Sequence, residues 1–106
     1  MRFQFMTPQT LGEKIAADQQ PVVVDIRDGN SFAAGRIKDS TALDNSNVQQ
    51  FIEQTPKDAP VVVCCYHGNS SQSAAQFLVD QGFSEVYSLQ GGYEMWKIAF
   101  PQYCES

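Results

Sequence analysis

The sequence has little of what builds metal centres and disulfide-linked folds. Its 106 residues include three cysteines and one histidine. Two of the cysteines, Cys64 and Cys65, are adjacent, which differs from the C-x-x-C spacing of zinc and thioredoxin-type sites. We therefore expect no metal ion, and free thiols of the kind found in a reducing cytoplasm.

Positive charge and long apolar runs are also scarce. Seven Lys and Arg residues stand against twelve Asp and Glu residues, giving a net charge of −5, so neither nucleic acid nor an anionic membrane is expected as a partner. No apolar run approaches the ~20 residues that cross a bilayer, and there is no signal-peptide core. The chain shows no repeats or linker-like stretches. We expect residues 1–106 to form a single cytoplasmic domain.

The most informative stretch surrounds Cys65. Residues 61–64 (VVVC) form a short β-branched run that is typical of a buried parallel strand, and apolar residues recur at helical spacing from Ser71 onwards. Cys65 therefore lies at the carboxyl end of a strand, where open α/β sheets place their ligand sites. The amides of the following loop and helix N-terminus are predicted to form an anion cradle around it.

Such a cradle would stabilise the reactive, ionised form of a cysteine. A free thiol with a pKa near ~8.5 is mostly protonated at neutral pH, and only the thiolate is a nucleophile. Backbone amides and a helix dipole favour the thiolate without a basic side chain. Gly68 and Asn69 suit a left-handed or closely packed backbone, and Ser70 or Ser71 is expected to cap the helix and add a hydroxyl donor. We expect Cys65 to be the nucleophile.

The remaining pattern alternates helices with strands. Strands are predicted at residues 21–26, 41–43 and 85–89. Helices are predicted from Thr7-Pro8 to residues 18–20, as one turn over residues 30–34, from a cap at Asn45 or Ser46 to Pro56, and from Gly91-Gly92 through Phe100. Gly82 is expected at the end of the helix that follows Cys65. This order predicts an α/β fold with a parallel sheet covered by helices on both faces. Tyr93, Trp96 and Phe100 are expected in the core, whereas Cys64 is expected to be inert and Cys104 to lie near a loose C-terminus.

Four segments together resemble the rhodanese family. They are residues 24–28 (VDIRD), Phe32 with residues 35–37 (GRI), residues 65–71 (CYHGNSS), and Gly91-Gly92-Tyr93 with Trp96. The resemblance extends over nearly the whole chain and is greatest to the single-domain thiosulfate sulfurtransferases of the GlpE type. It implies a rhodanese-like α/β fold of about five mainly parallel strands flanked by helices on both faces. It also implies a nucleophile at Cys65, in an active loop of six residues that ends at Ser70.

The resemblance further implies a sulfurtransferase. Cys65 would take the sulfane sulfur of thiosulfate as a persulfide and pass it to cyanide, a thiol or a thioredoxin-like dithiol protein, without a metal or organic cofactor. The loop contains no Arg or Lys, so substrate binding is assigned mainly to backbone amides, those of Tyr66, His67, Gly68, Asn69, Ser70 and Ser71. The ring of His67 is an alternative to its amide. Arg27 and Asp28 are expected to support the loop, or more simply to form an ion pair and a helix cap.

Two alternatives remain at this point. A persulfide carrier or protein-interaction module, which receives sulfur from a donor protein, would use the same Cys65 and the same amides. A cysteine phosphatase or arsenate reductase needs a wider loop and an arginine that grips a tetrahedral dianion. In the C-x5-R pattern that arginine would occupy position 71, where this chain has Ser71.

Overall fold

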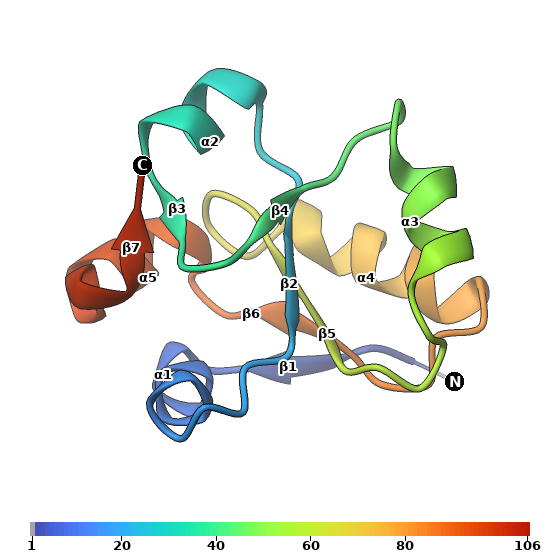
Figure 1. Cartoon of the computed structure of the whole chain (residues 1–106), viewed down its shortest axis with the longest axis horizontal. Helices are drawn as coiled ribbons and strands as arrows, with labels where there is room; N and C mark the ends of the chain where they lie inside the picture. The colour runs from blue at the N-terminus through green and yellow to red at the C-terminus, as the bar shows by residue number, and fades with distance from the viewer. Residues whose placement is uncertain (1) are drawn as a thin grey trace.

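The structure, a computed structural model, describes residues 2–106 and is built on one parallel sheet (Figure 1). Five strands lie in the order β1-β6-β5-β2-β4, and every pair in this sheet is parallel. A small antiparallel pair, β3 and β7, lies beside α5. The elements in chain order are β1 Gln4–Met6, α1 Pro8–Ala16, β2 Val22–Asp25, α2 Gly29–Ala34, β3 Arg36–Ile37, β4 Thr41–Ala42, α3 Val48–Gln54, β5 Val61–Cys64, α4 Ser70–Asp80, β6 Val86–Leu89, α5 Gly92–Ala99, the 3-10 helix η1 Pro101–Tyr103 and β7 Cys104–Glu105.

Helices cover both faces of the sheet. The central strand β5 is buried at all four positions, and successive residues point to opposite faces, as strand geometry requires. Val62 and Cys64 pack in the core under α1 and α5, whereas Val61 and Val63 pack in the core under α3 and α4. Fully burying such a side chain contributes about 1.5–3 kcal/mol. The predicted α/β architecture with helices on both faces is confirmed.

Most predicted elements are present within a few residues of their expected bounds. The Thr7 hydroxyl caps α1 by accepting a hydrogen bond from Thr10 N at 3.1 Å, and Pro8 occupies the first turn. Gly82 follows the C-cap of α4 with a φ of +106°. Trp96 and Tyr93 are buried in the core, and Phe100 packs against it, as expected.

Several local expectations are wrong. The N-cap of α3 is Asn47 rather than Asn45 or Ser46, because the Asp44 side chain engages Ser46 and the Asn47 side chain accepts from Asp44 N at 2.8 Å. Cys104 lies in β7, which pairs with β3, so the C-terminal end is held by strand pairing instead of being loose. The edge strand β1 was not predicted, since three residues carry too short a pattern. None of the helices within residues 2–106 has the length and apolar character needed to cross a membrane.

Candidate active site

Three strands of the sheet end together beside Cys65. β5 ends at Cys64, and β2 and β6 run parallel to it on either side, so all three carboxyl ends lie at one edge. The chain leaves β5 at Cys65, turns through residues 66–69, and enters α4 at Ser70. The first turn of α4 therefore points its free N–H groups back at the cysteine.

Hydrogen-bond donors surround the sulfur of Cys65. Gly68 N donates to Sγ at 3.1 Å and Ser71 N at 3.3 Å, while Ser71 Oγ lies 3.2 Å from Sγ. Burial raises the pKa of the thiol, but the Ser71 hydroxyl and the amides of Ser71, Gly68 and His67 outweigh it, so the pKa lies below its ordinary value. The residue is only 2% exposed. The surroundings of the sulfur therefore favour the thiolate over the thiol.

The Ser71 hydroxyl is itself hydrogen-bonded to a second buried hydroxyl, that of Ser88. Ser71 and Ser88 are both fully buried, and their Oγ atoms are 2.7 Å apart. Ser88 comes from β6, so two segments far apart in the sequence meet at the cysteine. Buried hydroxyls are stable only when they are hydrogen-bonded, which this pair achieves together with Sγ.

The loop is fastened from the other side by α5. Tyr93 N donates to Cys65 O at 2.8 Å, and Glu94 N donates to Tyr66 O at 3.1 Å. These amides belong to the first turn of α5, so the free donors of a second helix N-terminus hold the loop backbone.

Glycines allow this close approach. Gly92 has a φ of +59°, and a Cβ on it would lie 2.5 Å from Cys65 O and 2.6 Å from Tyr66 C. Gly68 has a φ of +89°, and a Cβ there would lie 2.9 Å from Gly91 N. At both positions the backbone is left-handed and another backbone segment lies too close to leave room for a Cβ atom, so only glycine fits. The Gly91-Gly92 turn therefore allows the backbone of the active loop to pack directly against the start of α5.

Arg27 and Asp25 form a buried ion pair beneath the site. The Arg27 guanidinium donates to Asp25 through Nε and Nη2, the latter at 2.8 Å, and Nη2 also donates to Gly35 O at 2.7 Å. Its carbon Cζ lies 4.2 Å from the centre of the Tyr93 ring. Arg27 is therefore committed to structural contacts, and its charge is compensated.

Asp28 connects the neighbouring strand to the loop. It is the N-cap of α2, and its carboxylate accepts a hydrogen bond from the hydroxyl of Tyr66. Hydrogen bonds from the Ser31 side chain and from Tyr66 lower the pKa of Asp28 to about 2. Asp28 is thus ionised across the physiological range and restrains Tyr66 at the mouth of the site.

Comparison with known proteins identifies the family. A family model, the rhodanese-like domain, matches residues 7–99 of the chain. The chain belongs to the rhodanese family.

Two relatives of this rhodanese carry the same name. Thiosulfate sulfurtransferase GlpE from Pseudomonas fluorescens (strain SBW25) is 57% identical over 84 residues, which cover 79% of this chain and 77% of that protein. The protein of the same name from Ectopseudomonas mendocina (strain ymp) is 54% identical over 99 residues, covering 93% and 89%. The solution NMR structure of a rhodanese-like domain from Anabaena sp. superposes with a TM-score of 0.85 at 22% identity, covering 100% of this chain and 80% of that one, and shows the shared fold. The resemblance seen in the sequence is confirmed.

The other loop residues of this rhodanese face solvent. Tyr66, His67, Asn69 and Ser70 are exposed. The N-cap of α4 is Asn69, without a side-chain hydrogen bond, so the expectation that Ser70 or Ser71 caps the helix is wrong. Ser71 instead lies within the first turn and turns its hydroxyl to the sulfur. The amides of Gly68 and Ser71 donate to Sγ at 3.1 and 3.3 Å, and the amide of His67 also favours the thiolate.

The other two cysteines have different surroundings. Cys64 is fully buried in the core, and burial followed by the charge of Asp25 raises the pKa of its thiol well above the ordinary value. Cys104 is half-buried, with Sγ 3.6 Å from Phe100 O. All three thiols are free. Cys65 is the thiol whose surroundings favour the anion.

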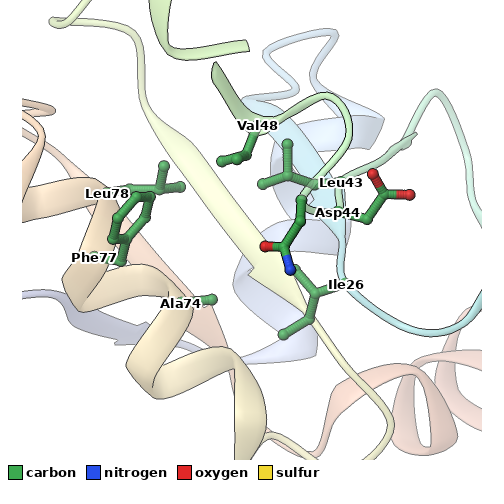
Figure 2. Close-up of a pocket in the computed structure, with 8 residues that line it drawn as sticks. Ile26, Leu43, Asp44, Val48, Ala74, Phe77 and Leu78 are labelled. Carbon is green, nitrogen blue, oxygen red and sulfur yellow. The ribbon is translucent and has the colours of Figure 1, made fainter. Parts of the chain in front are cut away.

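An apolar cavity lies on the α3 and α4 side of the sheet (Figure 2). Its volume is about 380 Å³, and Ala74, Phe77 and Leu78 of α4 lie across it from Ile26, Leu43 and Val48. Asp44 is the charged residue in its lining. A carboxylate among apolar side chains repels an anion, so this cavity does not fit the ligand that the cradle at Cys65 accepts.

Sequence reasoning missed two parts of the site. Ser88 gave no signal, because one serine in a short strand does not reveal what faces it. The contacts from the Tyr93 and Glu94 amides were also missed, although the Gly91-Gly92 pair was a sign of close backbone packing.

Proposed function

We propose that this chain is a thiosulfate sulfurtransferase in which Cys65 carries the transferred sulfur as a persulfide. The observation that carries the proposal is the polar environment of Sγ: the amides of Gly68 and Ser71 donate to it and the Ser71 hydroxyl forms a hydrogen bond with it, all within 3.3 Å. Such donors stabilise a sulfur anion in place and can hold a second one next to it. The relatives named thiosulfate sulfurtransferase GlpE support the choice of thiosulfate.

In the first half-reaction, the Cys65 thiolate attacks the sulfane sulfur of thiosulfate. An electron pair on Sγ forms the new S–S bond, and the S–S bond of thiosulfate breaks with its electron pair leaving on sulfite. The total charge of the reactants, −3, is conserved in the persulfide anion and sulfite dianion. The displacement is the same as in thiol–disulfide exchange, with a good anionic leaving group.

In the second half-reaction, an acceptor removes the outer sulfur. Cyanide attacks that sulfur, the bond to Sγ breaks, and the electron pair returns to Sγ, so that thiocyanate and the Cys65 thiolate are formed. The chain therefore alternates between two covalent states, which gives ping-pong kinetics. None of the steps requires a metal or an organic cofactor.

Substrate binding falls to the backbone of the loop. We assign it to the amides of residues 66–71, of which those of Gly68 and Ser71 already meet the sulfur. The neighbouring guanidinium of Arg27 is occupied by Asp25 and Gly35 O, so it is a supporting group, as is Asp28 through Tyr66. Ser71 at the position of a phosphatase arginine, buried and turned to Sγ, favours sulfur transfer over phosphate chemistry.

The acceptor and the setting are further parts of the proposal. Because Cys65 is only 2% exposed, a small acceptor such as cyanide or the protruding thiol of a thioredoxin-like dithiol protein is favoured. Three free thiols are consistent with a reducing cytoplasm. We treat residues 1–106 as a single rhodanese domain, of which residues 7–99 match the family.

The test is turnover of thiosulfate and cyanide to thiocyanate and sulfite. Wild-type protein should turn over with parallel double-reciprocal plots, and Cys65→Ser should be inactive while keeping its circular dichroism spectrum. The matched control is Cys104→Ser, which removes a half-buried thiol and should keep wild-type turnover.

Mass spectrometry after thiosulfate treatment provides the second readout. One added sulfur atom is expected on the peptide that contains Cys65 and on no other peptide. Wild-type protein that neither gains this sulfur nor forms thiocyanate would overturn the proposal; a protein charged by a persulfide donor alone would be a carrier.

A further inference from the structure

Ser88 is a buried polar residue that the steps above do not use. It lies in β6 opposite Val63 of β5, and it is fully buried. Within residues 2–106, the hydrogen bond of its side chain is the one with Ser71 Oγ, at 2.7 Å. An alanine at this strand position would avoid the cost of burying a hydroxyl. Any role of the Ser88 hydroxyl therefore acts through its hydrogen bond to Ser71.

The direction of the hydrogen bonds depends on the charge of Sγ. When Cys65 is a thiolate, the Ser71 hydroxyl can donate to Sγ and the Ser88 hydroxyl can donate to Ser71 Oγ, so every hydroxyl proton has an acceptor. When Sγ carries a proton and donates it to Ser71 Oγ, the Ser71 hydroxyl is free to donate to Ser88 instead of to Sγ. A charged Sγ is a stronger acceptor than a thiol, so charge on Sγ favours the arrangement in which Ser88 donates to Ser71 and Ser71 donates to Sγ.

We propose that Ser88 is a positioning residue that directs the Ser71 hydroxyl onto Cys65 Sγ, and that this two-hydroxyl relay serves the half-reaction in which Sγ leaves as a thiolate. The relay acts on Sγ through Ser71, without contact between Ser88 and the substrate. The assignment to one half-reaction rests on the proposed function.

The two half-reactions move charge in opposite directions at Sγ. When Cys65 attacks thiosulfate, Sγ loses its charge. Hydrogen bonds to Sγ raise the fraction of Cys65 that is present as thiolate, but they also make this thiolate a weaker nucleophile, so the two effects on the rate of attack partly cancel. When the acceptor attacks the outer sulfur, Sγ regains its charge, and a better-stabilised thiolate leaves faster. Removal of the Ser88 hydroxyl therefore affects discharge of the persulfide more than its formation.

Other titratable groups lie near Cys65, and among the described residues no hydrogen bond joins them to the side chain of Ser88. They are the Asp25–Arg27 pair and Cys64 at the ends of β2 and β5, His67 in the loop, and Tyr93 and Glu94 in the first turn of α5. A change in the pH dependence of Cys65 in a Ser88 variant can then be attributed to the relay.

The experiment measures the two half-reactions separately in the full chain. Sulfite release from thiosulfate reports charging, and thiocyanate release from the persulfide with cyanide reports discharge. Ser88→Ala should slow discharge about threefold to tenfold, as expected for weakening a hydrogen bond to a charged atom. At a pH where Cys65 is fully ionised, charging should stay within about twofold of wild type or become faster.

A third measurement does not depend on sulfur transfer. The rate of Cys65 alkylation by iodoacetamide, followed by mass spectrometry of its peptide, should show a midpoint at higher pH in Ser88→Ala than in wild type. Ser88→Thr keeps the hydroxyl and should restore discharge and midpoint. The matched control is Ser73→Ala, which removes an exposed hydroxyl from α4 and should change neither.

A double-mutant cycle tests the route through Ser71. Ser71→Ala should have an effect at least as large as Ser88→Ala, and adding Ser88→Ala to it should change nothing further. Equal slowing of both half-reactions, an unmoved alkylation midpoint, or additive effects in the double variant would each overturn the inference. Absence of thiosulfate turnover in wild type would instead refute the proposed function. The pH midpoint of Cys65 alkylation would then still test whether Ser88 acts on Sγ through Ser71.

Discussion

Replacement of Gly92 by alanine tests whether the Gly-Gly turn holds the active loop. The new Cβ would lie 2.5 Å from Cys65 O and 2.6 Å from Tyr66 C and O, at a φ of +59°. Ordinary contacts begin at 3.4 Å, so the loop and α5 must separate by about 1 Å. This strains the two hydrogen bonds from Tyr93 N and Glu94 N to the loop carbonyls.

The expected loss of stability follows from these contacts. A side chain in a left-handed backbone costs about 1–2 kcal/mol, and each weakened hydrogen bond about 0.5–1.5 kcal/mol. We expect Gly92→Ala to lower the free energy of unfolding in urea by about 2–5 kcal/mol. Because a misplacement of about 1 Å at a reacting atom costs about 10²-fold, thiocyanate formation should fall by about that factor in the protein that remains folded.

Gly29→Ala is the matched control. Gly29 is the first residue of α2, and a Cβ on it would meet no atom within 4 Å. Its unfolding free energy should change by less than about 1 kcal/mol, with full activity. Wild-type activity in folded Gly92→Ala would refute the view that α5 positions the active loop.

Three further predictions concern charges and thiols. Serine and tyrosine hydroxyls lower the pKa of Asp28 to about 2, below its ordinary value of 3.8, so its stabilisation is present above pH 3.8 and is lost as the pH falls through about 2. Asp28→Asn should therefore lower the calorimetric Tm at pH 7, and the difference from wild type should shrink towards pH 2; a constant difference would contradict this. Peptide mapping should find Cys65 alkylated at pH 7 while native Cys64 stays unmodified, because the pKa of Cys64 is raised by burial; equal labelling would speak against the cradle. A lysine at position 27 cannot bond Asp25 through two nitrogens and also reach Gly35 O, so Arg27→Lys should lower the free energy of unfolding in urea by about 1–3 kcal/mol. An unchanged free energy of unfolding would mean that the guanidinium geometry is dispensable.

The central part of the site could be predicted because its signals are local. The VVVC run and the helical spacing after Ser71 place a cysteine between a parallel strand and a helix N-terminus, and both elements are present at β5 and α4. The ion pair of Arg27 and the capping role of Asp28 were also visible, since they depend on neighbours two or three residues away.

Other features depend on partners that the local pattern does not name. Asn47 displaced the expected caps of α3 because Asp44 bonds the amide and hydroxyl of Ser46. β1 is defined by pairing with β6, and β7 by pairing with β3; strands of two or three residues have no periodicity of their own.

The amino-acid sequence alone predicted the alternation of the main helices and strands, the parallel sheet and Cys65 as the candidate nucleophile, because each follows from residues next to one another in the chain. Only the tertiary structure decided which hydroxyl reaches the sulfur and which helix restrains the loop. Ser71 and Ser88 are 17 residues apart, and the Tyr93 amide lies in another helix, so their meeting at Cys65 depends on how β6 and α5 pack beside β5. Hydrogen bonds between distant segments follow from strand register and helix placement, which the sequence pattern of each segment does not contain.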